Sequence, residues 1–458
     1  MGLLGIFLSL ILLMYLAYRE ISVLILAPLL ALLAVAMSGG LPILASYTQV
    51  FMVSLGGYLI TFFPLFLLGA IFGKVMADSG AARAIADRIV DTLGATRAIL
   101  AVVLSCGVLT YGGVSLFVVA FAVYPVGNAL FRRADIPKRL LPATIALGAF
   151  TFTMSAFPGT PAIQNAIPMP FFGTNVFAAP FLGLMAGGIM LVGGTLWLNR
   201  RAAAARAEGY GTHPAMPADA SLPENADLPS FTTAVLPVIA VIALNGLLTW
   251  VVFPRIDTGY LALPEYGGTT LSAVAGLWAI IVSLVLSICL AIALNLHRFA
   301  DLRGSVNEGA TGALAPMLNT ASVVGYGAVI ASLPAFLLVR DAVLGLFPDN
   351  PVASLAVAVM ALAGITGSAS GGMSIALETL GAQFAAMGQA QGISMELMHR
   401  VTALASGGFD ALPHNGAVIT LLAITGMTHR KSYADIFVVA VVIPAAALLA
   451  VILLGSVL

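Results

Sequence analysis

Long apolar stretches alternate with short polar loops along most of the chain, and this pattern predicts an all-α polytopic membrane protein. A helix needs about 20 apolar residues to cross a hydrocarbon core about 30 Å thick. By that rule the first half has spans near residues 2–18, 21–38, 50–76, 140–165 and 178–199. The second half has spans near residues 231–253, 270–296, 312–339, 400–428 and 432–457.

Two further apolar segments, 97–130 and 352–388, are interrupted in their middle. Each arm has about 14 residues and reaches about 21 Å at 1.5 Å per residue, which is too short to cross a bilayer. We therefore interpret both segments as re-entrant helical hairpins. Two ordinary short spans are the alternative, because hydropathy alone often fails to separate the two arrangements. The predicted pattern is five crossings plus one hairpin, used twice, with broken helices at 140–165 and 400–428.

The distribution of charge gives this pattern an orientation. Sixteen Lys and Arg residues fall in one set of loops, and only Arg255, Arg340 and Arg400 fall in the opposite set. The positive-inside rule places the richer set in the cytoplasm and both termini in the periplasm. Five crossings per half is an odd number, so the second half enters the membrane from the other side. We therefore expect two inverted repeats, 1–199 and 231–458, joined by a cytoplasmic linker at 200–230.

Composition supports a bilayer location. Of 458 residues, 60% are hydrophobic and 8% are charged, which is more apolar surface than a water-soluble core of this length could bury. Nineteen basic and nineteen acidic residues give no net charge, so nothing suggests a nucleic-acid partner. No basic residue precedes the first apolar run, which we interpret as a retained span. The segment 79–93 has apolar residues at helical spacing and is expected to form an interfacial helix beside the first hairpin.

A Gly-Gly-x-Ser motif lies in both interrupted segments, at 112–115 and 371–374, and each copy is followed by a break at a proline, Pro158 or Pro413. The motif serines are 259 residues apart and the prolines 255, so the two registers differ by four residues. A helix that begins inside the membrane leaves its first N–H groups unpaired, and such an end binds a carboxylate without a cationic side chain. Ser115 and Ser374 are expected to cap the returning arms. Close helix packing is the alternative for either copy alone.

The prolines mark the second pair of breaks. Thr160 followed by Pro161 predicts the start of a half-helix, and Asn415-Gly416 serves the same purpose in the second half. Two membrane halves broken at matching points are typical of a secondary transporter whose substrate lies where the halves meet. The residues predicted to bind substrate are Tyr111, Gly112, Gly113, Ser115, Gly159, Thr160, Gln164, Asn165, Ser370, Gly371, Gly372, Ser374, His414 and Asn415.

Ionisable residues inside spans are costly and are usually kept for function. Asp410 and His414 are four residues apart and share a face if the backbone is helical, so we interpret them, with Glu378, as candidates for proton coupling. The alternatives are an internally bonded pair that fixes the broken helix and a Glu378 that only faces water. No predicted span interior contains Lys or Arg. Helix ends, hydroxyls and amides would hold an anionic substrate, which suits a single carboxylate.

Other classes of function find less support in the residues. The chain has no phosphate loop, which argues against ATP-driven pumping, and no cofactor or metal site is expected. An intramembrane aspartyl protease needs two facing acids, and Asp410 is the only aspartate placed deep in a span, so no enzyme is expected. A passive channel stays open as an alternative.

At these motifs the chain resembles the gluconate permease (GntP) family of the ion transporter superfamily, and within it members that carry 3-hydroxybutyrate. The resemblance covers nearly the whole chain and is carried by residues 111–115, 157–161, 367–372 and 412–416. It implies a bacterial inner-membrane proton symporter of small hydroxy or sugar acids. It also implies a homodimer that moves its substrate by an elevator-like motion. Sodium-coupled branches carry Ser-Asn-Thr-type motifs at the hairpin tips, and this chain has none there.

Pattern and resemblance together predict a proton-coupled symporter of a small hydroxy-monocarboxylate of the gluconate or 3-hydroxybutyrate type, working by alternating access. The substrate is expected between the two hairpin tips and the two broken spans. Two alternatives remain within the class: a transporter of a zwitterionic D-amino acid, whose ammonium group would pair with Asp410, and a sodium-coupled carboxylate transporter.

Overall fold

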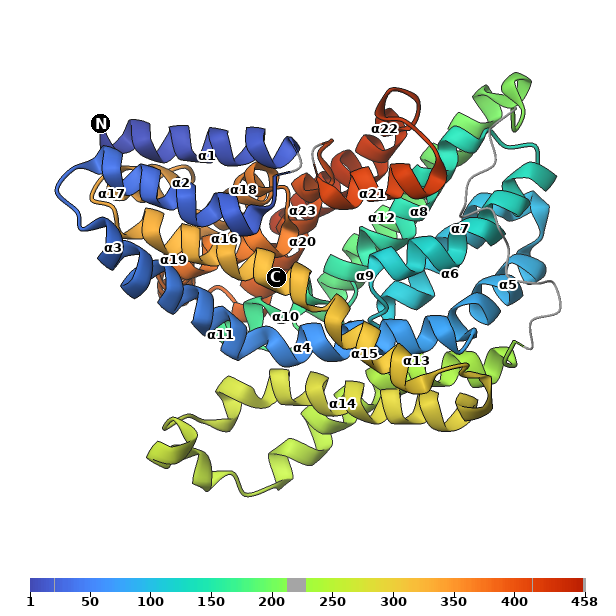
Figure 1. Cartoon of the computed structure of the whole chain (residues 1–458), viewed down its shortest axis with the longest axis horizontal. Coiled ribbons are helices and arrows are strands. Elements are labelled where there is room, and N and C mark those ends of the chain that lie inside the picture. Colours follow the sequence, from blue (N-terminus) through green and yellow to red (C-terminus); the bar gives the residue numbers. More distant parts are fainter. Residues whose placement is uncertain (20, 212–227, 414, 456–458) are drawn as a thin grey trace.

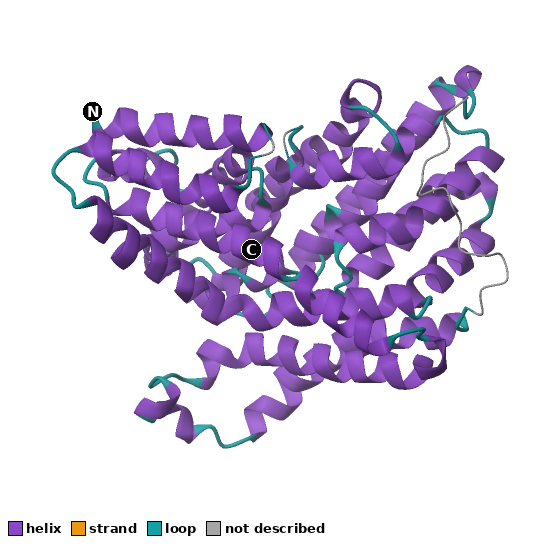
Figure 2. Cartoon of the chain, viewed as in Figure 1, coloured by secondary structure: helices purple, strands orange, loops and turns teal. Residues whose placement is uncertain are grey.

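The computed structural model describes residues 1–19, 21–211, 228–413 and 415–455, and these ranges contain helices and loops but no strand (Figure 2). The first half forms α1 (Gly2–Tyr18), α2 (Val23–Ser38), α3 (Ile43–Ala45), α4 (Met52–Asp78), α5 (Ala81–Leu93), α6 (Ala98–Tyr111), α7 (Leu116–Arg133), α8 (Leu141–Ala149), α9 (Phe152–Ser155), α10 (Ile163–Ala166), α11 (Pro168–Phe172) and α12 (Pro180–Ala204). The second half forms α13 (Phe231–Leu247), α14 (Leu271–Asn295), α15 (Leu302–Gly312), α16 (Leu314–Ser332), α17 (Phe336–Leu344), α18 (Pro351–Thr366), α19 (Ala369–Ala390), α20 (Met395–Gly408), α21 (Gly416–Thr425), α22 (His429–Phe437) and α23 (Ile443–Gly455). The predicted all-helical fold class is confirmed.

Six helical runs in the described part of the chain are long and apolar enough to cross a membrane. They are Ile43–Asp78, Pro180–Ala204, Phe231–Arg255, Leu271–Arg298, Leu302–Ser332 and His429–Gly455. The helices α1 and α2 form where spans were predicted but have only 17 and 16 residues. Large apolar side chains such as Ile60, Trp250 and Leu286 lie on the surface of these runs, where contact with lipid avoids the cost of exposure to water. The protein is therefore a multi-pass membrane protein.

Each interrupted apolar segment forms two helices joined by a tight turn. The helices α6 and α7 are joined by residues 112–115, and α18 and α19 by residues 367–368. The entering arms, with 14 and 16 residues, are close to the expected length. The returning arms, with 18 and 22 residues, are longer because they continue past the apolar stretch into polar residues. Figure 1 shows α6 and α7 on the right of the molecule and α18 and α19 on the left.

The helix predicted at 79–93 is α5. Its buried face, which includes Ala81, Ala82 and Ile85, packs against α6, α7 and α13. The chain then turns by 102° into the helical run that ends at Tyr111, because Gly94 and the short polar stretch after it end α5. The predicted position beside the first hairpin is confirmed.

Two apolar clusters hold the helices together. The larger one contains buried residues of α5, α6, α7 and α8 and of α12, α18, α19 and α20. The smaller one joins α1 and α2 to α16, where the Ser9 and Tyr326 hydroxyls form a buried hydrogen bond of 2.7 Å. The pair α13 and α14 packs on α4 and α5 at the lower edge of Figure 1. Within the larger cluster, α9 and α10 contact α20, so the broken segments of the two halves meet inside the molecule.

Candidate substrate-binding site

The first Gly-Gly-x-Ser motif forms the tip of the α6–α7 hairpin. Gly113 has φ = 94°, a left-handed conformation that favours glycine. A Cβ atom on Gly113 would lie 2.7 Å from Cγ of Pro161, and one on Gly112 would lie 2.5 Å from Cγ1 of Val238 in α13. The glycines therefore let the tip approach both the first break and α13 more closely than any side chain would allow.

The helix α7 begins directly after this tip. Ser115 occupies its N-cap position, as predicted, but the hydroxyl makes no capping hydrogen bond to the backbone. An uncapped helix start presents N–H groups and a partial positive charge. The beginning of α7 thus keeps its capacity to bind an anion.

The second Gly-Gly-x-Ser motif has a different structural role. The α18–α19 turn begins four residues before the motif, at Gly367 (φ = 61°), and the N-cap of α19 is Ser368, whose Oγ accepts a hydrogen bond from Gly371 N at 3.1 Å. The prediction that Ser374 caps this helix is wrong. The Ser374 hydroxyl lies six residues after this cap, buried beside the Tyr58 hydroxyl and without a hydrogen bond of normal geometry.

The glycines of the second motif serve close helix packing instead, which was the alternative interpretation. A Cβ atom on Gly372 would overlap the backbone of Ala363 in α18. The structurally matching points are the hairpin turns: Ser368 lies 253 residues after Ser115, close to the 255 residues between Pro158 and Pro413. Matching the turns halves the register difference that the motif serines suggested, from four residues to two.

The first break separates α9 from α10. Thr160 does not begin the next helix as predicted, because α10 starts at Ile163 and the Thr160 hydroxyl accepts a hydrogen bond from Ala162 N at 3.3 Å. Gly159 has φ = 87° and donates from its N–H to Val176 O at 2.9 Å. The Tyr111 hydroxyl donates to Pro158 O at 2.6 Å. These bonds tie the break to the hairpin tip and to the segment before α12.

Asn165 uses all its hydrogen-bonding capacity inside the protein. Its Nδ2 donates to Thr160 O at 3.0 Å and to Val176 O at 2.8 Å, while its Oδ1 is 3.1 Å from Nε2 of His399 and accepts from Nη1 of Arg400 at 3.0 Å. The expectation that no span interior contains Lys or Arg is wrong. Arg400 was placed in a loop, but it lies within α20 with no solvent-exposed surface.

The second break is organised around Asn415, which caps α21 as predicted through Oδ1, the acceptor for Ala417 N and Val418 N. Its Nδ2 donates to Gly367 O and to Oδ1 of Asp410. The same Asp410 oxygen accepts from Ala369 N, the first residue of α19, at 2.8 Å. The start of α19 therefore already holds a carboxylate of the chain. His414 lies outside the described residues.

Two further predicted residues lie on α19. The Ser370 hydroxyl is 3.3 Å from the Thr320 hydroxyl and 3.4 Å from that of Ser368. Glu378 is exposed on the surface of the helix. Neither of them lies at the first break.

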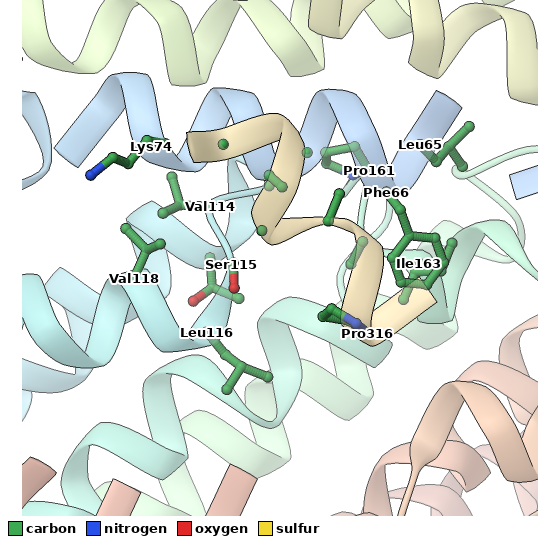
Figure 3. A pocket seen from close by; sticks show the side chains of 18 of the residues that line it. Leu65, Phe66, Lys74, Val114, Ser115, Leu116, Val118, Pro161, Ile163 and Pro316 are labelled. Atoms are coloured by element: carbon green, nitrogen blue, oxygen red, sulfur yellow. The ribbon is translucent and has the colours of Figure 1, made fainter. Parts of the chain in front are cut away.

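A cavity of about 410 Å³ lies at the first hairpin tip (Figure 3). Its walls come from α4, the α6–α7 tip, the first break and the bend between α15 and α16. Most of the lining is apolar, with Leu65, Phe66, Val114, Leu116, Pro161 and Ile163 among the residues. Gly113, Ser115 and Gln164 are the predicted site residues that line it; none of the described residues predicted in the second half does.

Three polar residues of the cavity, Lys74, Thr110 and Glu308, lay outside the predicted set. The Thr110 hydroxyl is buried without a hydrogen-bond partner. Lys74 and Glu308 form an ion pair of 2.8 Å at the edge of the cavity, and Lys74 also contacts Asp78 at 3.1 Å. The signal for Lys74 was present in the sequence, because it lies inside the predicted span 50–76. It had been counted with the loops.

No three His, Cys, Asp or Glu side chains in the described ranges lie close enough together to hold a metal ion. The cavity offers the start of α7, the hydroxyls of Thr110 and Ser115, the Gln164 amide and apolar walls, with the Lys74–Glu308 ion pair at its edge. This set of groups can bind a small organic anion through its carboxylate and hydroxyls.

Comparisons with known proteins agree with this architecture. The uncharacterized transporter YxjC of Bacillus subtilis (strain 168) is 48% identical over 471 residues, covering 100% of this chain and 99% of YxjC. An uncharacterized transporter of Haemophilus influenzae is 32% identical over 180 residues, 39% of this chain.

Two solved structures share the fold at low sequence identity. The YdaH transporter of Alcanivorax borkumensis has a TM-score of 0.57 and 18% identity, covering 89% of this chain and 88% of YdaH. MtrF of Neisseria gonorrhoeae, from a class of antimetabolite efflux pumps, has a TM-score of 0.56 and 12% identity, covering 95% of this chain and 94% of MtrF. The model of the GntP family permeases matches residues 1–457, and the chain therefore belongs to the GntP permease family.

Proposed function

We propose that this permease carries a small hydroxy-monocarboxylate, of the gluconate or 3-hydroxybutyrate type, in symport with protons. One observation carries the proposal: the uncapped start of α7, the partnerless Thr110 hydroxyl and Gln164 belong to one cavity. The helix start offers N–H groups for a carboxylate. Thr110 and Gln164 offer partners for hydroxyl groups, and the apolar walls offer contact for the carbon chain.

The charges around the cavity favour a substrate with one carboxylate. Lys74 is already paired with Glu308 and Asp78, so a second carboxylate would have to displace a protein carboxylate from it. The cavity volume of about 410 Å³ lies at the lower end of the about 300–1,000 Å³ typical of small-molecule sites. A small acid fits these limits.

For the proton we propose Asp410. Its carboxylate contacts the start of α19 and the Asn415 amide at the second break, so protonation would weaken the contacts between the second hairpin and the second broken helix. Glu378, exposed on α19, is a second candidate on the proton path. His414 is a third candidate on the basis of the sequence. Asp410 does not line the cavity, which disfavours a zwitterion whose ammonium group pairs with it.

Further parts of the proposal rest on the order of the elements. Each half has the same order of elements: a long helix, a short helix (α5 or α17), a hairpin and a broken helix. This is the order expected for the inverted repeats 1–199 and 231–458. We propose that the halves work by alternating access in a homodimer. We also propose the bacterial inner membrane with the basic loops in the cytoplasm and both termini in the periplasm.

The deciding experiment is uptake into proteoliposomes that hold the purified protein. Labelled gluconate and 3-hydroxybutyrate are tested with an imposed pH gradient, with a sodium gradient and with neither. Uphill accumulation with the pH gradient alone is the expected result. Accumulation driven by the sodium gradient would show that sodium and not the proton is the coupling ion. Equal uptake without any gradient would indicate a channel. Inhibition by a D-amino acid but not by the hydroxy acid would shift the substrate class.

A further inference from the structure

One face of α20, in the second half, carries Glu396, His399 and Arg400, which are three and four residues apart and therefore lie together. All three contact the irregular chain of the first half between residues 155 and 179. We propose that this face, with Arg400 at its centre, is a positioning element that sets the shape of the first break from the opposite half. The proposal rests on the proposed function in one respect only: the first break lines the cavity that we suggest binds the substrate.

Arg400 makes five hydrogen bonds to the first half. Nε and Nη2 donate to Ala178 O at 3.1 and 2.8 Å, Nη2 also donates to Val176 O at 3.4 Å, and Nη1 donates to Ser155 O at 3.3 Å and to Asn165 Oδ1 at 3.0 Å. Among the described residues, no carboxylate lies within ion-pair distance of this guanidinium. A buried cation is tolerated only when it is well hydrogen-bonded, so the site is built around the forked shape of arginine.

Arg400 supplies the donors for the carbonyl groups of Ser155 and Ala178, and it adds to those of Val176 O, which also accepts from Gly159 N and Asn165 Nδ2. Ser155 ends α9, and Val176 and Ala178 lie in the irregular chain before α12. Backbone that leaves a helix at membrane depth must find partners in the protein. A side chain from the other half supplies them here.

His399 and Glu396 complete the contact. The Thr174 hydroxyl is 2.6 Å from Nδ1 of His399, whose Nε2 is 3.1 Å from Asn165 Oδ1. A neutral imidazole that accepts from Thr174 and donates to Asn165 satisfies both distances. Glu396 Oε2 accepts from Ala179 N at 3.0 Å, where Ala179 has the unusual φ of 43°.

These contacts reach the cavity through Asn165. Its neighbour Gln164 lines the cavity, and Asn165 Nδ2 holds Thr160 O at the other end of the short segment 161–164, all of which lines the cavity. A displacement of Asn165 relative to α20 would therefore move one wall of the cavity. Arg400 itself does not line the cavity, so it acts through the break rather than on the substrate.

The fold offers a direct way to test this. A Cβ atom on Gly407, two turns after Arg400 in α20, would lie 3.5 Å from Cβ of Ser155, which is within the range for a disulfide. A cysteine pair at these positions can hold the break against α20 without Arg400. All variants carry Cys106→Ala and Cys289→Ala, which remove the natural thiols.

The first measurement needs no substrate. Ala162→Cys places a thiol on the cavity wall, and its rate of reaction with N-ethylmaleimide reports the shape of the break. We expect Arg400→Lys to change this rate about tenfold, the scale expected for losing one or two buried charge-assisted hydrogen bonds. The oxidised Ser155→Cys/Gly407→Cys bridge should return the rate to the Arg400 value. Arg303→Lys, the same change at an exposed arginine of α15, is the matched control.

An unchanged labelling rate in Arg400→Lys would overturn the proposal, as would a changed rate that the bridge fails to restore. If Arg400→Lys does not reach the membrane, Thr174→Val removes the partner of His399 and leaves the buried charge in place. It should shift the rate in the same direction by a smaller factor, and no shift would be equally contradictory.

The second measurement is uptake of labelled gluconate and 3-hydroxybutyrate. Arg400→Lys should raise KM about tenfold and the bridge should restore it. A permease that carries neither acid would contradict the proposed substrate while the thiol measurement still decides the role of Arg400.

Discussion

At the scale of single residues, the hydroxyl group of Thr110 is the sharpest marker of a binding site. A buried hydroxyl normally has a partner, and most threonines in this fold donate to a carbonyl of their own helix; Thr144, for example, donates to Leu140 O at 2.8 Å. Thr110 lacks such a bond and lines the cavity. The missing partner is expected to come from the substrate.

Thr110→Val should therefore raise KM for the transported acid about tenfold, the effect of one lost hydrogen bond of about 1.4 kcal/mol. The folded protein should lose no stability, because the hydroxyl has no partner to lose. Uptake kinetics and thermal melting in detergent measure the two effects. Thr144→Val is the control with the opposite pattern: KM within about twofold, and a melting point lowered by the loss of a bond worth about 1 kcal/mol. Equal KM values for both variants would remove Thr110 from the site.

Asp410 provides the second residue-scale prediction. Asn at position 410 keeps an oxygen that can accept from Ala369 N and Asn415 Nδ2, the two bonds that Asp410 makes, but it removes the ionisable group. Asp410→Asn should abolish accumulation driven by a pH gradient while substrate exchange across the membrane continues. Asp349→Asn, at an exposed loop position, should leave both activities intact. Normal pH-driven accumulation in Asp410→Asn would exclude it from the proton path.

At the scale of elements, the two hairpins show what a repeated sequence motif does and does not determine. The apolar pattern predicted both helix pairs, because the run of hydrophobic residues and the glycines that interrupt it are local properties. It did not reveal that the first Gly-Gly forms a turn and the second lies inside a helix. The second turn lies at Gly367 and Ser368 instead, and Gly372 packs against the backbone of Ala363 in α18, a contact that depends on how the two helices meet.

Gly372→Ala tests the second hairpin directly. The new methyl group would overlap the backbone of α18, so the helices must separate, at a cost of about 3 kcal/mol. The amount of protein in the membrane and its melting temperature in detergent should both fall. Gly188→Ala in α12 is the control, since a Cβ atom there meets nothing within 4 Å, and it should be neutral or slightly stabilising. Full stability of Gly372→Ala would contradict the packing role.

The candidate site was predictable to a smaller extent than the fold. Gly113, Ser115 and Gln164 were found because a glycine pair and nearby polar residues in an apolar run stand out. Arg400 was missed because α20 begins at Met395, before the expected boundary at residue 400. A polar first turn resembles the end of a loop, and the carbonyl groups that bury this arginine come from residues more than 220 positions earlier.

At the scale of the whole molecule, the cavity lies between elements that are far apart in the sequence: α4, the α6–α7 tip, the first break and the bend between α15 and α16. The helices α4 and α15 close one side of it, and they meet where a Cβ atom on Gly309 would lie 2.8 Å from Cα of Ile71. The ion pair between Lys74 and Glu308 and a 2.6 Å hydrogen bond from Ser305 to Asp78 join the same two helices. These contacts hold α4 and α15 together along this side of the cavity.

Glu308→Gln should loosen this side. The pair is partly exposed and is worth about 1 kcal/mol or less, so the labelling rate of Ala162→Cys by a charged, membrane-impermeant thiol reagent should rise by no more than about fivefold. The reagent should gain this access from one side of sealed vesicles only. Glu265→Gln, in the exposed loop before α14, should have no effect. An unchanged rate from both sides would show that the ion pair does not close the cavity.

The dependence of the first break on Arg400 also has a consequence for how the protein is made. Ribosomes synthesise a chain from its N-terminus, and domains usually complete themselves in that order. Here the carbonyl groups of Ser155 and Ala178 receive their hydrogen bonds from Arg400, and therefore only when residue 400 has been inserted. The first half of this permease therefore enters the bilayer with these carbonyl groups lacking their donor, and its first break is completed only after most of the second half has been synthesised.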